Sequence, residues 1–161
     1  MKDIIFSPIG IVHSDYTINL GTPIQPDESV KNTGVIEIFN QFSAGLEDID
    51  GFSHIYVLYH FHKNIDFKLS VKPFMDDNYH GVFATRAPKR PNGIGLSLLK
   101  ISSVIENRIC VFGIDILDKT PVLDIKPYIG EFSKMENISM GWLSDKFHGF
   151  SKTKDDGRFN I

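Results

Sequence analysis

The chain has 161 residues, of which 42% are hydrophobic and 23% are charged, and its formal net charge at pH 7 is −3. This length and composition predict one globular domain. The single cysteine, Cys110, excludes an internal disulfide, and its apolar surroundings favour a buried, inert thiol. No signal peptide is recognisable and no apolar run could span a bilayer, so we expect a cytoplasmic protein without a membrane partner.

The charge is unevenly distributed along the chain. Residues 62–100 hold seven lysines and arginines against three aspartates, a net charge of +4, so the rest of the chain carries −7. A polyanionic partner would fit this asymmetry if the cations share one face. An ordinary solvated surface fits the composition slightly better.

Strand signals dominate the sequence. They cover residues 4–14, 34–39, 53–62, 81–86, 96–105 and 108–117. Glu106 and Asn107 separate the last two segments and predict a tight hairpin. Because few connections are long enough for a crossover helix, we expect a mainly β fold, with an antiparallel sheet closed into a small barrel or a sandwich.

Helix signals are sparse and predict one or two short helices. One turn is expected at 44–48, and the spacing of Ile138, Trp142 and Phe147 predicts a short helix packed on the barrel. The polar stretch 18–31 predicts a long loop, which in a compact domain is usually functional or disordered. We expect one domain over residues 1–150 and a loose, charged tail over residues 151–161.

Several common kinds of site are poorly supported. His54, His60 and His62 share one face of a predicted strand, but no carboxylate or thiol stands at ligand spacing, so no metal site is expected. No serine or cysteine occupies a recognisable nucleophile turn. Gly93 and Gly95 lack the third glycine of a dinucleotide-binding turn, and a strand rather than a helix follows them.

Two polar segments rich in proline carry more chemistry. In residues 84–101, prolines stiffen a loop that holds Arg86 and Arg90. Such a loop could recognise a carboxylate or a phosphate. A proline-rich barrel corner with incidental surface charge fits the residues equally well. In residues 117–130, Asp118 and Thr120 could form turns or hydrogen-bond a ribose or an amine. Asp124 and Lys126 would face the same way in an extended segment, and an ion pair is the favoured interpretation.

Five motifs together resemble the TsaA-like, or TrmO, family of S-adenosylmethionine-dependent tRNA methyltransferases. They are "SPIGIVHS" (7–14), "DGFSHIYVLYHFH" (50–62), "GVFATRAPKRPNGIGLSLLKI" (81–101), "DKTPVLDIKPY" (118–128) and "GWL" (141–143). The resemblance implies a small antiparallel β-barrel and a homodimer with S-adenosylmethionine bound near the interface. It also implies methylation of N6 on threonylcarbamoyl-adenosine, beside the anticodon of a threonine tRNA.

The resemblance also places residues. It implies a cofactor site made of Gln25, Pro26, Asp27, His62, Lys63, Arg86, Leu96, Asp118, Lys119, Thr120 and Pro121. It implies substrate contacts in the motifs that contain Arg90, Asn92, Lys126 and Tyr128. The catalytic base is not identified by the resemblance. Candidates are Asp124, His62 and Tyr128, with solvent as an alternative.

Three departures from the family pattern keep other functions open. Gly93 replaces a proline, which should loosen the loop, and Lys119 replaces a glycine, which should alter the next turn. The bacterial enzymes carry a further C-terminal domain, whereas this sequence stops soon after the predicted barrel. The alternatives are a module that binds S-adenosylmethionine without transferring a methyl group and a methyltransferase for small molecules.

Overall fold

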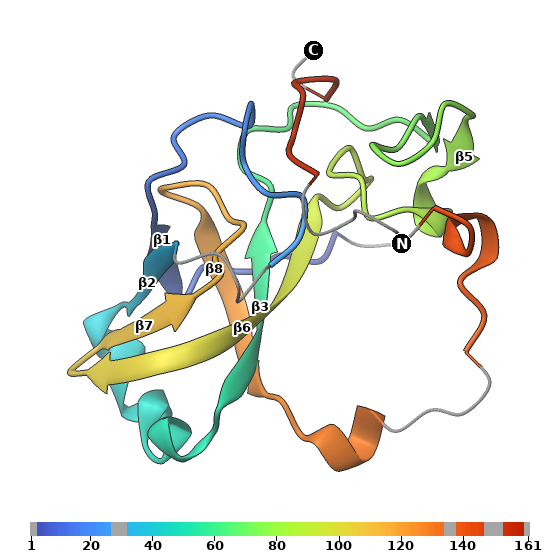
Figure 1. Ribbon diagram of the computed structural model, residues 1–161. Helices are drawn as coiled ribbons and strands as arrows, with labels where there is room; N and C mark the ends of the chain where they lie inside the picture. Colours follow the sequence, from blue (N-terminus) through green and yellow to red (C-terminus); the bar gives the residue numbers. More distant parts are fainter. Residues whose placement is uncertain (1–2, 27–31, 134–137, 147–152, 160–161) are drawn as a thin grey trace.

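The computed structural model describes residues 3–26, 32–133, 138–146 and 153–159 (Figure 1). Six strands form a closed barrel in the order β1-β2-β7-β6-β3-β8, and every neighbouring pair is antiparallel. The expected small antiparallel β-barrel is therefore confirmed. The barrel strands are β1 (Gly10–His13), β2 (Thr33–Ile38), β3 (His54–His60), β6 (Ile94–Ile105), β7 (Arg108–Phe112) and β8 (Pro121–Pro127).

The barrel closes around an aliphatic core because its strands alternate between inward and outward side chains. On β3, Ile55 and Val57 are completely buried, and on β7 the same holds for Ile109 and Val111. Each buried side chain of this size contributes about 1.5–3 kcal/mol relative to leaving it in water. A barrel this small is filled by its own side chains, so any ligand site must lie at one of its ends.

The hairpin between β6 and β7 forms where the sequence predicts it. Ile105 pairs with Arg108, so Glu106 and Asn107 make a two-residue turn. The side-chain amide of Asn107 donates to the carbonyl of Ile38 at 2.6 Å, and the backbone carbonyl of Asn107 accepts from the backbone N–H of Ile38 at 2.8 Å. These bonds tie the turn to the end of β2.

Two strand predictions need correction. Residues 81–86 are mostly not a strand: β5 (His80–Gly81) pairs only with β4 (Ser70–Val71), and the 3-10 helix η3 (Val82–Ala84) follows. The Thr85 hydroxyl donates to the Val82 carbonyl at 2.9 Å, which favours this turn over extended backbone. Conversely, β8 was not predicted, yet it pairs with both β1 and β3 and closes the barrel.

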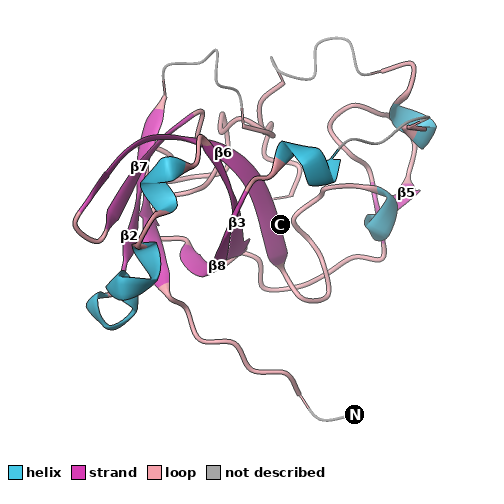
Figure 2. Cartoon of the chain, turned by 90° about the horizontal axis from the view of Figure 1, so that it is seen from below, coloured by secondary structure: helices cyan, strands magenta, loops and turns pink. Residues whose placement is uncertain are grey.

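All helices in the described part of the chain are short and of the 3-10 type (Figure 2). None of them is long and apolar enough to cross a membrane. The turn expected at 44–48 corresponds in part to η1, and the C-terminal helix expected around Trp142 is the single turn η5, with Phe147 outside the described residues. Besides η3, the 3-10 helices in the described residues are η1 (Asn40–Leu46), η2 (Ile49–Gly51), η4 (Gly130–Ser133) and η5 (Gly141–Leu143).

Between β3 and β6 the chain leaves the barrel in a long excursion, residues 61–93, which contains β4, β5 and η3. Figure 1 shows it beyond the upper end of β3, with residues 138–146 and 153–159 close to it. Phe159 is 6% exposed and packs edge-on against Phe74 of the excursion at a centroid distance of 5.1 Å. The expectation of a loose tail is therefore wrong for residues 153–159, which are packed against the domain.

Candidate functional site

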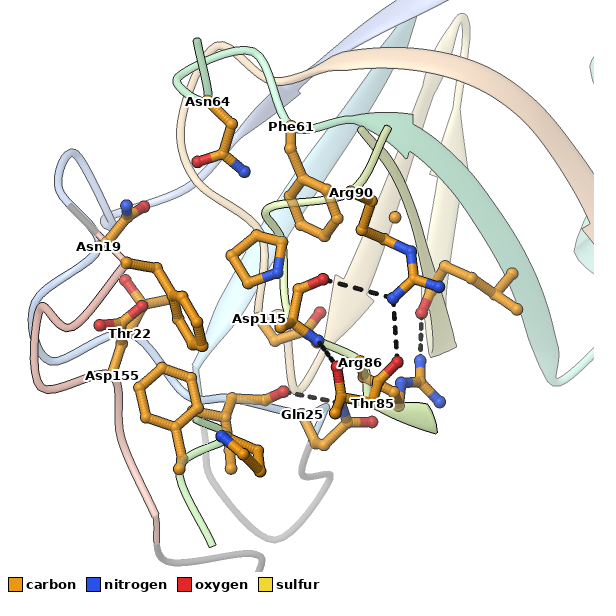
Figure 3. Close-up of a pocket in the computed structure, with 18 of the residues that line it drawn as sticks. Asn19, Thr22, Gln25, Phe61, Asn64, Thr85, Arg86, Arg90, Asp115 and Asp155 are labelled. Carbon is orange, nitrogen blue, oxygen red and sulfur yellow. Dashed lines mark hydrogen bonds between the residues drawn. The ribbon is translucent and has the colours of Figure 1, made fainter. Parts of the chain in front are cut away.

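A cavity of about 650 Å³ lies where the upper end of the barrel meets the excursion (Figure 3). This volume is in the range of small-molecule sites, which are concave and mostly apolar with a few convergent polar groups. Its apolar lining includes five aromatic side chains, Phe61, Phe74, Phe83, Trp142 and Phe159.

The cavity brings together most of the residues that the family resemblance assigns to the cofactor. They come from the loop before β2, the end of β3, the loop after η3, β6 and the turn before β8: Gln25, His62, Lys63, Arg86, Leu96 and Thr120. Asp118, Lys119 and Pro121 flank Thr120 without lining the cavity, and Pro26 follows Gln25 in the same way. Asp27 lies outside the described residues.

The cavity excludes two of the three candidate bases. Asp124 lines a second hollow beside η1 and η2 and forms an ion pair with Lys126 at 2.8 Å, which is the predicted pairing. Tyr128 packs edge-on against His54 and Tyr56 at centroid distances of 6.2 and 5.6 Å. Of the candidates, only His62 lines the large cavity.

Arg86 reaches the cavity from the loop that follows η3. Its guanidinium group donates to the carbonyl of Leu96, a second cavity residue on the neighbouring strand β6. This bond fixes the arginine at the rim of the cavity. A fixed guanidinium group is suited to bind a carboxylate or a polar edge of a ligand.

Two other cations of the excursion, Arg90 and Lys89, have partners within it. Arg90 lines the cavity but donates from Nη1 to the carbonyls of Val82 and Thr85 at 3.1 and 2.9 Å, which braces the loop that carries Arg86. Lys89 is 3% exposed and pairs with Asp66 at 2.7 Å. Part of the positive charge of this segment therefore stabilises the fold of the excursion itself and is not free to bind a partner. Asn92 is in the same loop and does not line the cavity.

A buried polar cluster forms the floor of the cavity. The Ser97 hydroxyl donates to the Asp115 carboxylate at 2.7 Å, and Tyr59 and Ser97 share a hydrogen bond of 3.3 Å. Burial raises the pKa of Asp115 to about 7, and it raises the pKa of Tyr59 well above its usual range. Sequence reasoning missed Asp115, although a lone carboxylate in the apolar run "GIDIL" is a usable signal.

His62 links the end of β3 to the turn before β8. Its Nδ1 lies 3.3 Å from the hydroxyl of Thr120, which is 3% exposed. Burial and the neighbouring Lys63 lower the pKa of His62, so this ring is mostly neutral at pH 7. A neutral ring can accept a hydrogen bond or a proton. Within the described residues, no group of three or more His, Cys, Asp and Glu could hold a metal ion.

The backbone has positive φ at the two positions where the sequence departs from the family motifs. Lys119 has φ = 63°, a left-handed conformation that favours glycine, so the turn keeps a glycine-like shape with a lysine in it. Gly93 has φ = 53°, and its N–H donates to the carbonyl of Arg90. A proline at position 93 could adopt neither feature.

Comparison with known proteins identifies the family. Residues 11–134 match the tRNA-methyltransferase O N-terminal domain. The chain belongs to this family. Over 88% of this chain, the crystal structure of TrmO from Pseudomonas aeruginosa has the same fold, with a TM-score of 0.73 and 34% identity, and this region is 63% of that chain.

Two relatives differ in the share of their length that this chain covers. A probable S-adenosyl-L-methionine-binding protein of Pyrococcus abyssi is 47% identical over 156 residues, which are 97% of this chain and 85% of the relative. The tRNA (adenine(37)-N6)-methyltransferase of Mus musculus is 37% identical over 145 residues, or 86% of this chain. The chain spans only 34% of the length of the mouse enzyme. The expected family membership is confirmed.

Proposed function

We propose that this chain is an S-adenosylmethionine-dependent methyltransferase that modifies N6 of adenine 37 in tRNA. The observation that carries the proposal is the cavity, in which six of the residues assigned to the cofactor converge on one side of the barrel end. The name of the mouse relative supports adenine 37 of tRNA as the acceptor. The name of the Pyrococcus relative supports S-adenosylmethionine as the cofactor.

The cavity has the size and chemistry that S-adenosylmethionine requires. When bound, this cofactor supplies a methyl group on a positively charged sulfur atom. Arg86, Thr120 and Gln25 would hold its polar groups, and the aromatic lining would cover its adenine ring. By fixing both partners, the chain would align the acceptor nitrogen with the methyl group and exclude water, which can supply about 7–11 kcal/mol of the barrier reduction.

We further propose that the acceptor is threonylcarbamoyl-adenosine. Its carbamoyl group makes the N6 proton more acidic, so a base near the cavity can remove it during attack. Of the earlier candidates only His62 lines the cavity, and Asp115 at the cavity floor is a further side chain suited to this step, because Asp124 and Tyr128 lie elsewhere. Asp115 is the stronger base of the two, since its pKa is raised and that of His62 is lowered, and we assign the proton transfer to it.

A tRNA is much larger than the cavity and must also touch the surface around it. Asn92, Lys126 and Tyr128, which lie outside the cavity, stay predictions for such contacts, and Arg90 would act mainly by bracing the loop of Arg86. We also propose a cytoplasmic location, which the proposed tRNA substrate supports.

We propose a homodimer, as the family resemblance implies. Large apolar side chains are exposed close to the cavity, among them Phe83 at 75%, Leu96 at 44% and Ile94 at 38%. A monomeric protein rarely exposes a large contiguous apolar patch, whereas a second copy would cover it. Sedimentation at micromolar concentration with S-adenosylmethionine present should give the dimer mass, and a monomer mass would contradict a pocket near an interface.

One observation favours a second candidate function, that of a binding module. The S-adenosyl-L-methionine-binding protein of Archaeoglobus fulgidus is 41% identical over 134 residues, which are 96% of that relative. Its name describes cofactor binding and mentions no transferase activity. Incubation with S-adenosylmethionine labelled in its methyl group and with bulk tRNA separates the two. Label in tRNA supports the proposal, whereas cofactor binding without label in tRNA supports the module or a small-molecule acceptor.

A further inference from the structure

Two segments beyond the family match take part in the cavity. The match ends at residue 134, yet Met140, Trp142 and Leu143 line the cavity, and so do Asp155 and Phe159. The family domain by itself therefore leaves part of the cavity wall to the chain that follows it. We call residues 153–159 the C-terminal segment.

The C-terminal segment is fastened to the loop that carries Gln25. Lys154 forms a β-bridge with Pro23. The N–H of Gly21 donates to the carbonyl of Asp155 at 2.8 Å, and the N–H of Asp155 donates to the carbonyl of Thr22 at 2.8 Å. These backbone bonds hold the side chain of Asp155 at the cavity in a defined position.

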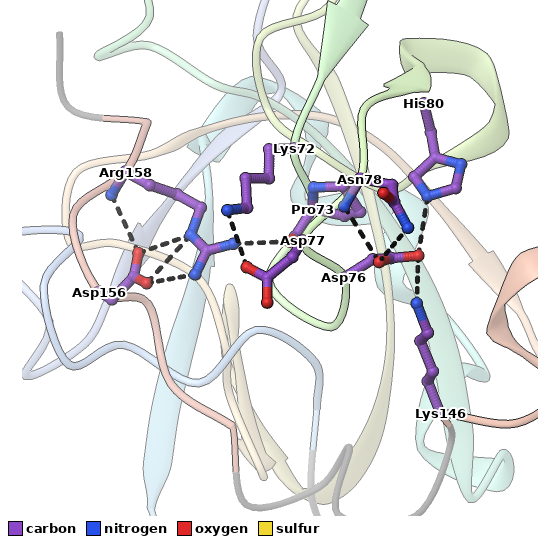
Figure 4. A network of polar contacts seen from close by, with 9 residues as sticks. All are labelled: Lys72, Pro73, Asp76, Asp77, Asn78, His80, Lys146, Asp156 and Arg158. Carbon is purple, nitrogen blue, oxygen red and sulfur yellow. Dashed lines mark hydrogen bonds and ion pairs between the residues drawn. The ribbon is translucent and has the colours of Figure 1, made fainter.

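The same segment is also fixed to the excursion (Figure 4). Arg158 lies over the ring of Phe74 at 5.1 Å and donates to the carbonyl of Pro73 at 2.6 Å. Nearby, Asp76 forms an ion pair with Lys146, which fastens the preceding segment 138–146 to the excursion, and His80 of the excursion hydrogen-bonds the same carboxylate at 3.0 Å. Both segments are thus part of the folded domain and not flexible additions to it.

Asp155 differs from the other carboxylate in the cavity. Among the described lining residues, only Asp115 and Asp155 are acidic. Asp115 accepts a hydrogen bond from Ser97 and lies in the electrostatic field of Arg86. Asp155 accepts at Oδ1 from the backbone N–H of Gly157 at 2.7 Å and is half-buried. Its negative charge is therefore the better placed of the two to serve a bound cation.

S-adenosylmethionine brings two positive charges into such a cavity, an ammonium and a sulfonium group, together with one carboxylate, all at its methionine end, so its net charge is +1. Transfer of a cation from water into a mostly apolar cavity is unfavourable unless an anion pairs with it. Lys63, Arg86 and Arg90 already make the lining rich in cations. A carboxylate of the protein in the same lining would balance the remaining positive charge of the ligand.

We propose that Asp155 is a cofactor-binding residue that the C-terminal segment supplies, and that it pairs with the positively charged methionine end of S-adenosylmethionine. This inference rests on the cofactor of the proposed function but not on methyl transfer. It places the methionine end of the cofactor beside the loop of residues 19–25 and assigns a role to a part of the chain outside the matched family domain.

The test compares Asp155→Asn with Asp156→Asn by calorimetry on the full chain. An asparagine at 155 can still accept from the N–H of Gly157, so the backbone arrangement is kept while the charge is lost. Asp156 pairs with Arg158 and does not line the cavity, so Asp156→Asn is a control with the same charge change in the same segment. The ligands are S-adenosylmethionine and 5′-methylthioadenosine, which keeps the nucleoside and sulfur but lacks the ammonium group, the sulfonium charge and the carboxylate.

Loss of a charge-assisted pair should weaken binding of S-adenosylmethionine to Asp155→Asn about tenfold and leave 5′-methylthioadenosine within about twofold. Asp156→Asn should bind both ligands like the wild type. The inference is overturned if Asp155→Asn binds S-adenosylmethionine normally, if both ligands weaken equally, or if the wild type binds no S-adenosylmethionine. Wild-type protein that binds the cofactor but methylates no tRNA would remove the proposed function alone.

Discussion

Asp115→Asn should make the protein more stable and less active at the same time. The carboxylate of Asp115 is held at the cavity floor by Ser97, in surroundings that raise its pKa from 3.8 to about 7. The folded protein therefore disfavours the ionised form, which a base needs. An asparagine has nearly the same shape and can still accept from Ser97, but it carries no charge.

The magnitude follows from the pKa. At about 1.36 kcal/mol for each pH unit, ionising Asp115 costs the folded state at most about 4 kcal/mol at pH 8. Because the side chain is half-buried and faces the cavity, water offsets part of this ionisation cost. We therefore expect Asp115→Asn to raise the free energy of unfolding by about 1–3 kcal/mol. Between pH 4 and 7 the folded state keeps a proton that the unfolded state has released. The contribution of Asp115 to stability is thus complete below about pH 4 and is lost as the pH rises through 7.

Urea unfolding at pH 5 and pH 8 tests this, with the exposed Asp50→Asn as a control. The stability gain of Asp115→Asn should be largest at pH 8 and fall to less than half at pH 5, while the control changes little at either pH. Methyl transfer should drop at least tenfold with cofactor binding retained. A gain that does not depend on pH, or a variant that is more stable and fully active, would refute the reasoning.

Three further substitutions test other parts of the structure. Arg86→Ala should weaken S-adenosylmethionine binding about tenfold or more by calorimetry, because it removes the guanidinium group fixed at the cavity rim by Leu96; wild-type affinity would remove Arg86 from the site. Lys119→Gly should raise the free energy of unfolding by about 1 kcal/mol, because φ = 63° strains a lysine, and Lys119→Ala should show no such gain. Gly95→Ala should lower stability by about 1–3 kcal/mol, because the new Cβ would come within 2.3 Å of the ring of buried Tyr59; Gly81→Ala, with open space around it, is the matched control, and equal stabilities would show that the ring moves freely.

The barrel could be predicted from the sequence because most of its strands show alternating apolar and polar residues, and because Glu106 and Asn107 indicate a hairpin turn. β8 was missed because it begins with Pro121 and ends with Pro127. Prolines are unfavourable inside a sheet but are tolerated at the ends of a strand, where the missing N–H disrupts no ladder. The turn at 82–84 was missed because a threonine side chain decides it, and periodicity does not detect such a local bond.

The motifs propose a set of cofactor residues, but which of them line one cavity could not be predicted from the sequence. Thr120, Asp124 and Tyr128 stand in one motif, yet a strand rises about 3.3 Å per residue, which carries the last two roughly 13 and 26 Å away from Thr120. Asp115 and Asp155 were missed for a different reason. Their positions depend on the closure of the barrel and on the packing of Phe159, and neither leaves a periodic pattern in the sequence.

The most direct test of the account is a mass-spectrometric analysis of methylated nucleosides. Purified protein is incubated with S-adenosylmethionine and tRNA from cells that lack the endogenous enzyme, and the tRNA is digested. We predict the gain of one methyl group on threonylcarbamoyl-adenosine, and its loss with Asp115→Asn. Unchanged nucleosides, together with intact cofactor binding by calorimetry, would contradict the proposal that this barrel methylates tRNA.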